Sequence, residues 1–71
     1  MDELFFEAAE TIISTGQAST SYLQRKLSVG FARAGRIIDQ LQEKGVISPA
    51  NSKNQREILM TLDDLNALRK E

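Results

Sequence analysis

Arg36 and Asp39 are the side chains whose types and spacing could carry chemistry in this chain. They stand three residues apart in a segment that reads as a helix, on the side opposite its apolar residues. An arginine can hydrogen-bond O6 and N7 of guanine together, and a carboxylate can accept from the amino group of cytosine. Because a carboxylate near DNA phosphates is otherwise repelled, the pair favours selective base reading. The alternative is an ordinary surface pair, which stabilises a helix by about 0.2–0.5 kcal/mol.

Basic and polar side chains around this pair are candidates for further DNA contacts. Arg33 lies nearer the start of the same helix, where it could reach a phosphate or a base. The helix before a reading helix usually crosses the DNA backbone, so its side chains are phosphate candidates. The predicted backbone contacts are Gln24, Arg25, Lys26, Ser28, Lys53 and Arg56. As alternatives, Lys26 and Lys53 could simply face solvent. Arg56 could instead pair with Glu57 or with a neighbour across a hairpin.

Three predicted helices position these side chains. Apolar residues at helical spacing predict helices over 3–14, 20–27 and 31–44. Asp2 can cap the first helix, Gly16 can end it, and Ser19 can cap the second. Between the second and third helices, Ser28-Val29-Gly30 predicts a tight turn, with Gly30 supplying a conformation that β-carbons resist. Two helices joined by a short turn with a glycine are typical of a helix-turn-helix.

A hairpin is predicted after Gly45, which ends the third helix. The two strands are expected over 46–48 and 56–60. The stretch between them, 49–55, includes Asn54 and is rich in residues that favour turns. A hairpin directly after a helix-turn-helix is the wing of a winged helix.

A last helix is predicted over 61–71, where Thr61 and Asp64 resemble a capping box. Its leucines stand three residues apart and could pack on the core or bind a partner. The aromatic residues are expected in the core rather than in a stacking surface; they are Phe5, Phe6, Tyr22 and Phe31. The third helix is expected to point Phe31, Ala34, Ile37, Ile38 and Leu41 inward. We therefore expect a mainly α winged helix-turn-helix with a small β-hairpin, formed by one domain over 1–71 with its core in 2–60.

Length and composition exclude most catalytic functions. A chain of 71 residues buries only roughly 60% of its unfolded surface, which leaves room for one small core and no deep cleft. It has no cysteine and no histidine, so it lacks thiolate zinc ligands and the commonest general base. Its four glycines are isolated and form no phosphate-binding loop. No signal peptide or membrane-spanning stretch is recognisable. We expect a soluble cytoplasmic domain that is not an enzyme and needs no cofactor or metal.

Charge is unevenly distributed along the chain. The net charge of −1 argues mildly against nucleic-acid binding, because such domains are often basic. However, residues 1–21 carry −4, whereas residues 22–45 carry +3. The positive charge therefore lies in the predicted helix-turn-helix. A well-mixed surface of an ordinary soluble domain is the alternative interpretation.

The sequence LQRKLSVGFARAGRIIDQLQEKGVIS resembles the small C-terminal gamma domain of the FtsK/SpoIIIE septal DNA translocases. The resemblance rests on polar as well as apolar residues, chiefly Gln24, Arg25, Gly30, Phe31, Arg33, Ala34, Arg36 and Asp39. The following SKNQREILM is similar to the wing of that family. The resemblance covers roughly residues 2–60.

The family resemblance implies a role for each of three positions. In the family, the residues two, six and nine after the glycine of the turn contact bases. Counted from Gly30, these are Ala32, Arg36 and Asp39. Ala32 differs from the Asn or Thr that the family often has, so an apolar contact with a thymine methyl, or no reading at all, is expected there.

The family resemblance also implies partners. Its domains bind short, polar, G-rich motifs in double-stranded DNA and so orient an attached ATP-driven motor at cell division. In some bacteria they also contact a XerD-type tyrosine recombinase. The implied partners are therefore DNA, the motor in the same chain and a recombinase, without direct membrane contact.

Two functions of other classes remain open from the residues. The acidic first helix and low net charge favour a protein-interaction winged helix, for instance one that docks on a recombinase. A free-standing plasmid or phage regulator with the same fold would be expected to dimerise through its last helix.

Overall fold

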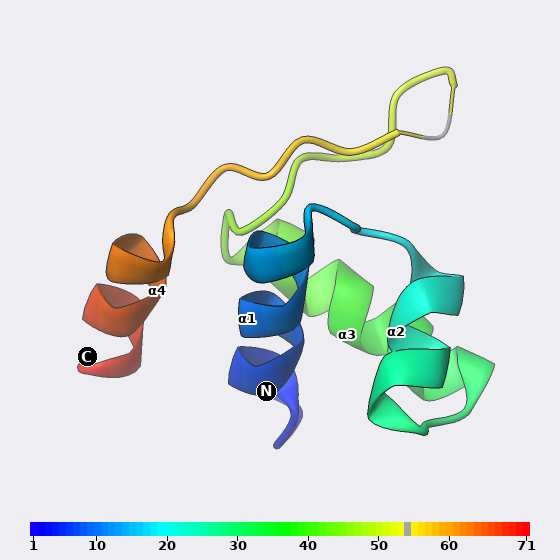
Figure 1. The fold of residues 1–71 in the computed structure, drawn as a ribbon, viewed down its shortest axis with the longest axis horizontal. Coiled ribbons are helices and arrows are strands. Elements are labelled where there is room, and N and C mark those ends of the chain that lie inside the picture. The colour runs from blue at the N-terminus through cyan, green and yellow to red at the C-terminus, as the bar shows by residue number, and fades with distance from the viewer. Residues whose placement is uncertain (54) are drawn as a thin grey trace.

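The computed structural model describes residues 1–53 and 55–71. It contains helices α1 (Phe5–Thr15), α2 (Thr20–Leu27), α3 (Phe31–Glu43) and α4 (Leu62–Arg69). Figure 1 shows α1 beside α3, α2 across α3, and α4 on the other side of α1. The helical content and order agree with a small winged-helix-like domain.

The helix ends follow local chemistry. The Ser19 hydroxyl accepts from the backbone N–H of Tyr22 at 3.0 Å and caps α2, as predicted. Gly16 adopts a left-handed conformation with φ 76° and ends α1, and Gly45 with φ 80° follows the end of α3 in the same way. The prediction for the first helix start was early, because α1 begins at Phe5. Asp2 instead accepts from the N–H of Leu4 one turn ahead of the helix.

The turn between α2 and α3 differs from the prediction at Gly30. Ser28 takes the left-handed conformation, with φ 54°, and its N–H bonds to the carbonyl of Gln24. Gly30 is extended, with φ −71° and ψ 160°, and a β-carbon there would meet open space. The polar Ser28 therefore provides the strained turn residue that the sequence assigned to the glycine.

Residues 46–53 and 55–60, which we call the arm, run from a base packed against the helices to an end that projects beyond them (Figure 1). The two halves of the arm run antiparallel and meet at one bridge, between Ile47 and Ile58. The N–H of Leu59 donates to the carbonyl of Val46 at 2.8 Å. Within the described residues this is less than the two predicted strands, so only the antiparallel pairing of the hairpin is present. Of the predicted loop, Asn54 lies outside the described residues.

A single cluster of apolar side chains joins all four helices and the base of the arm. Its buried members from α1 and α2 are Phe5, Ala8, Ala9, Ile12 and Leu23. The other buried members are Ala34, Ile37, Ile38, Leu41, Val46, Ile47 and Leu65. The predicted stripe of α3 is confirmed except at Phe31, which is 62% exposed. Burial of this continuous surface fixes α3 against α1 and α2 and leaves its opposite side in solvent.

Helix α4 packs on α1 rather than projecting from the domain. Its predicted capping box is present, since Thr61 and Asp64 exchange side chain-to-backbone hydrogen bonds of 3.1 and 3.0 Å. Leu65 is buried in the core. Arg69 forms an ion pair with Glu10, and its guanidinium lies 4.9 Å from the centre of the Phe6 ring. Leu65, the middle of the three leucines of α4, is thus buried within the domain itself.

Candidate nucleic-acid interface

The outer side of α3 is the centre of the candidate interface. Ala32, Arg36 and Asp39 are all exposed there, opposite the buried residues of the helix. Within the described chain, no hydrogen bond or ion pair joins Arg36 to Asp39. The simple surface-pair interpretation is therefore not realised, and both side chains keep their hydrogen-bonding capacity for a partner. A helix with such a face has the dimensions that the major groove admits.

Arg33, on the flank of α3, is held by a partner from another part of the chain. Its Nε and Nη2 each donate to a carboxylate oxygen of Asp2 at 2.9 Å. These hydrogen bonds lower the pKa of Asp2 to about 2, with the N–H of Leu4 and the charge of Arg36 acting in the same direction. The same pairing raises the pKa of Arg33. For Arg33 to contact a base or phosphate, as predicted, its guanidinium would have to leave this carboxylate.

The basic residues of α2 are separate from this ion pair. Arg25 and Lys26 are both exposed in its last turn and lie beside the half-buried Tyr22. Tyr22 therefore does not belong to the buried core as predicted. Gln24 is half-buried, whereas Ser28 is exposed at the turn into α3. These four predicted backbone-contact residues therefore lie on α2 or at its end, and Lys26 also lines a hollow together with Glu7 and Glu10 of α1.

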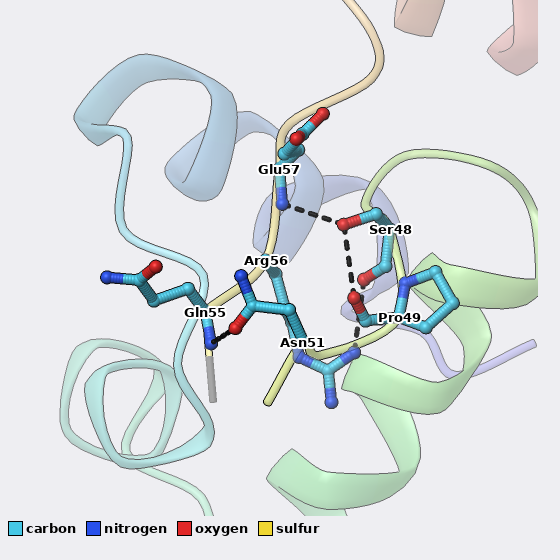
Figure 2. A pocket seen from close by; sticks show the side chains of 6 residues that line it. All are labelled: Ser48, Pro49, Asn51, Gln55, Arg56 and Glu57. Carbon is cyan, nitrogen blue, oxygen red and sulfur yellow. Dashed lines mark hydrogen bonds between the residues drawn. The ribbon is translucent and has the colours of Figure 1, made fainter. Parts of the chain in front are cut away.

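Arg56 links the arm to the end of α3. Its Nη1 donates to Oε1 of Gln42 at 2.9 Å and to the carbonyl of Ser48 at 3.3 Å. Figure 2 shows the Arg56 side chain turned toward Ser48, which lies on the other half of the arm. Of the two alternatives for Arg56, contact with a neighbour across the arm is the one present in the described residues. Lys53, by contrast, is exposed near the tip.

The base of the arm is also held by side chains. The Ser48 hydroxyl accepts from the N–H of Glu57 at 2.8 Å (Figure 2). Closer to the tip, the carboxamide oxygen of Asn51 accepts from the N–H of Lys53 and of Gln55, at 2.9 and 3.0 Å. Backbone hydrogen bonds across the arm act beside these contacts: the N–H of Ser48 donates to the carbonyl of Glu57, and the N–H of Asn51 to that of Gln55, both at 2.9 Å. The pairing is therefore recognisable although the described residues form only one bridge.

Phe31, like Tyr22, lies outside the core in which it was predicted. It lines one hollow together with the N-cap Ser19, with Thr20 and Ser21 of α2, and with Arg56. Residues from α2, α3 and the arm therefore meet at this hollow. Its helical spacing from Ala34 and Ile38 suggested burial, but Phe31 is the first residue of α3 and stays 62% exposed at the edge of this hollow. Its position directly after Gly30 was the available signal.

The fold is that of a small, mainly helical, winged-helix-like domain. The chain belongs to the Ftsk gamma domain family, whose profile matches residues 1–61. It is 56% identical over 64 residues to "DNA translocase FtsK" of Clostridium acetobutylicum, covering 90% of this chain and 8% of that protein. It is 48% identical over 67 residues to "DNA translocase FtsK" of Caldanaerobacter subterraneus subsp. tengcongensis, covering 94% of this chain and 9% of that protein.

A third relative, which has a different name, matches a similar share of this chain. The chain is 47% identical over 64 residues to "DNA translocase SftA" of Bacillus subtilis, which covers 90% of this chain and 7% of that protein. The chain thus spans less than a tenth of the length of these relatives. None of the helices in the described residues has the length and apolar character needed to cross a bilayer.

Proposed function

We propose that this domain binds double-stranded DNA in a sequence-specific manner and orients an attached translocase motor on the chromosome. The observation that carries the proposal is the solvent-facing side of α3, where Arg36 and Asp39 stand free of each other in a member of the gamma domain family. The domain contributes recognition and no catalysis. It acts in the cytoplasm, beside the septum at which the longer protein is anchored.

Each part of the interface has a distinct task in this proposal. Arg36 reads a guanine, Asp39 accepts from a cytosine or orients Arg36, and Ala32 meets a thymine methyl. Arg25 and Lys26 bind phosphates from α2, and the arm serves as the wing, with Lys53 reaching a flanking phosphate. Gln24 and Ser28 add weaker backbone contacts. Arg56 contributes chiefly by fixing the arm to α3, because Gln42 and Ser48 already occupy part of its guanidinium.

Selection of bound duplexes from a random library tests the proposal. We expect a short G-rich motif without inversion symmetry to be enriched. Arg36→Ala should then reduce the affinity for that motif by about 10-fold or more, since a bidentate arginine–guanine contact is worth about 1–3 kcal/mol of discrimination. Arg36→Lys is the matched control, because it keeps the charge and loses the two-pronged geometry. Equal affinity of the unaltered domain for the enriched motif and a scrambled duplex would contradict the proposal.

A protein-docking role has one observation in its favour. Leu59 at the end of the arm and Leu62 at the start of α4 are 53% and 44% exposed. A XerD-type tyrosine recombinase is the partner that the family suggests. Binding of such a recombinase that survives Arg36→Ala, in a domain that binds no duplex, would favour docking over DNA reading.

A further inference from the structure

Asp2 is held in place by hydrogen bonds of both its side chain and its backbone. Its carboxylate accepts two hydrogen bonds from Arg33 and one from the N–H of Leu4, all at 2.9 Å. Its own N–H donates to Oε1 of Gln40 at 2.9 Å, and its carbonyl accepts from Phe5 at 3.0 Å. The side chain is only 13% exposed. The carboxylate is therefore held in one position against the flank of α3.

This position places a negative charge beside the proposed reading helix. Arg33 and Gln40 lie two turns apart on α3, and the exposed Arg36 lies between them in the sequence. The Arg33 side chain is 40% exposed, so the ion pair is open to solvent at one side. A phosphate that approached α3 could compete for the guanidinium of Arg33.

A carboxylate and a phosphate offer an arginine the same kind of partner. Both present two oxygens to the planar fork of the guanidinium. An arginine that grips phosphates strengthens binding to every duplex equally, because phosphate contacts carry no sequence information. Occupation of the fork by Asp2 therefore removes a sequence-independent contact from the surface around α3.

We propose that Asp2 is a specificity-determining residue that acts through Arg33: it occupies the guanidinium and keeps it off DNA phosphates, so that discrimination depends on Arg36 and Asp39. This inference rests on the proposed DNA-binding function. Asp2 itself contacts no DNA; it is a positioning residue. A purely structural role, in which Asp2 only attaches the start of the chain to α3, predicts lower stability on its removal and no change in how DNA binding responds to salt.

Binding of the Asp2→Asn variant to a scrambled duplex and to the selected motif, over a range of salt concentrations, tests the inference. Asparagine keeps the size of the side chain and removes its charge. Release of Arg33 should add one phosphate contact, which steepens the slope of log K against log salt by about 0.9. The same contact corresponds to about eightfold tighter binding of the scrambled duplex at 0.1 M salt. The affinity ratio of motif to scrambled duplex should fall as a result.

Two further variants separate the mechanism from general charge effects. Glu3→Gln changes the net charge by the same amount at the neighbouring exposed residue. The charge of Glu3 acts on Arg33, but no hydrogen bond joins the two among the described contacts, so this variant should change the slope less than Asp2→Asn does. Asp2→Asn combined with Arg33→Gln should lose the added slope. Asp2→Asn and Glu3→Gln with equal slopes would overturn the inference.

The outcomes stay interpretable if folding or specificity fails. If Asp2→Asn does not fold, Arg33→Gln tests the same point, because an arginine that is kept off phosphates can be removed without making the slope shallower. A slope shallower by about 0.9 in that folded variant would overturn the inference. An unaltered domain that binds motif and scrambled duplex equally would contradict the proposed function, yet the slope for scrambled DNA would still test Asp2. No duplex binding by either protein at low salt would overturn both.

Discussion

Arg33 and Arg36 are alike in type and lie on the same helix, yet their surroundings differ. Arg33 gives the edge of its guanidinium that is formed by Nε and Nη2 to Asp2, whereas Arg36 faces solvent. The sequence shows both arginines outside the apolar stripe and offers no means of telling them apart. Their difference comes from a residue 31 positions away. Availability for binding is therefore a tertiary property, even where residue type and spacing suggest the chemistry.

The Asp2–Arg33 ion pair should make the free energy of unfolding of the domain depend on pH in the acid range. The pKa of Asp2 is about 2 in the folded domain, below its usual value in an unfolded chain. Because the lowered pKa stabilises the fold only while Asp2 is ionised, this contribution is complete above about pH 4 and is lost as the pH falls toward 2. Urea unfolding from pH 6 to pH 2 should show unaltered protein and Asp2→Asn converging in stability as the pH falls.

Glu3→Gln is the matched control for this titration, because Glu3 is exposed and lies next to Asp2. A constant difference between unaltered protein and Asp2→Asn across the whole pH range would show that the ionised carboxylate adds nothing to stability.

At the scale of elements, the helices were predictable because their apolar periodicity coincides with good caps. Ser19, Gly16, Gly45 and the Thr61 capping box all act as the sequence indicates. The arm was predictable only as a pairing of two segments. A few backbone hydrogen bonds and one bridge hold its segments together, beside side-chain hydrogen bonds such as those of Ser48 and Arg56. Periodicity also misplaced Phe31, because a regular pattern does not show that the first residue of a helix lies in an open hollow.

Two glycines, one inside α3 and one just after it, test how backbone conformation affects stability, because both positions have room for a β-carbon. A β-carbon at Gly35 or at Gly45 would meet nothing within 4 Å. Gly35 is inside α3, so Gly35→Ala should stabilise the domain by up to about 1 kcal/mol through helix propensity. Gly45 has φ 80°, so Gly45→Ala should destabilise it by about 1–2 kcal/mol.

Thermal and urea unfolding of the two glycine variants measure these effects. The opposite signs are the essential result, because the substitution is chemically identical in both. A destabilising Gly35→Ala would show that the helix interior at this point is under a constraint that the backbone angles do not reveal.

At the scale of the whole molecule, charge is only partly segregated although the total is close to neutral. The acidic residues of α4 lie away from the basic residues of α2, because Figure 1 shows α4 on the far side of α1 from α2. On the near side, Lys26 of α2 lines one hollow together with Glu7 and Glu10 of α1. Since screening limits electrostatic contacts to about 10 Å at 0.1 M salt, the acidic residues of α4 weaken DNA binding little. A net charge of −1 is thus compatible with a DNA-binding face.

Local rather than total charge should govern the salt dependence of DNA binding. Lys26→Gln removes an exposed cation of α2 and should make the slope of log K against log salt shallower by about 0.9. Asp63→Asn alters the net charge by one in the opposite direction on α4 and should leave the slope as it is. Equal and opposite changes in the two variants would indicate that only net charge matters. Fluorescence anisotropy with a labelled duplex provides the measurement.

The attachment of Asp2 to α3 has a mechanical consequence. A pull on the amino end of the chain reaches Asp2 first, and Asp2 is bonded to Arg33 and Gln40 before the chain enters α1. Tension is therefore delivered to the helix that carries Arg36 without having to unwind α1. Under the proposed function, a pull on the amino end of this domain would therefore load the same helix that binds DNA.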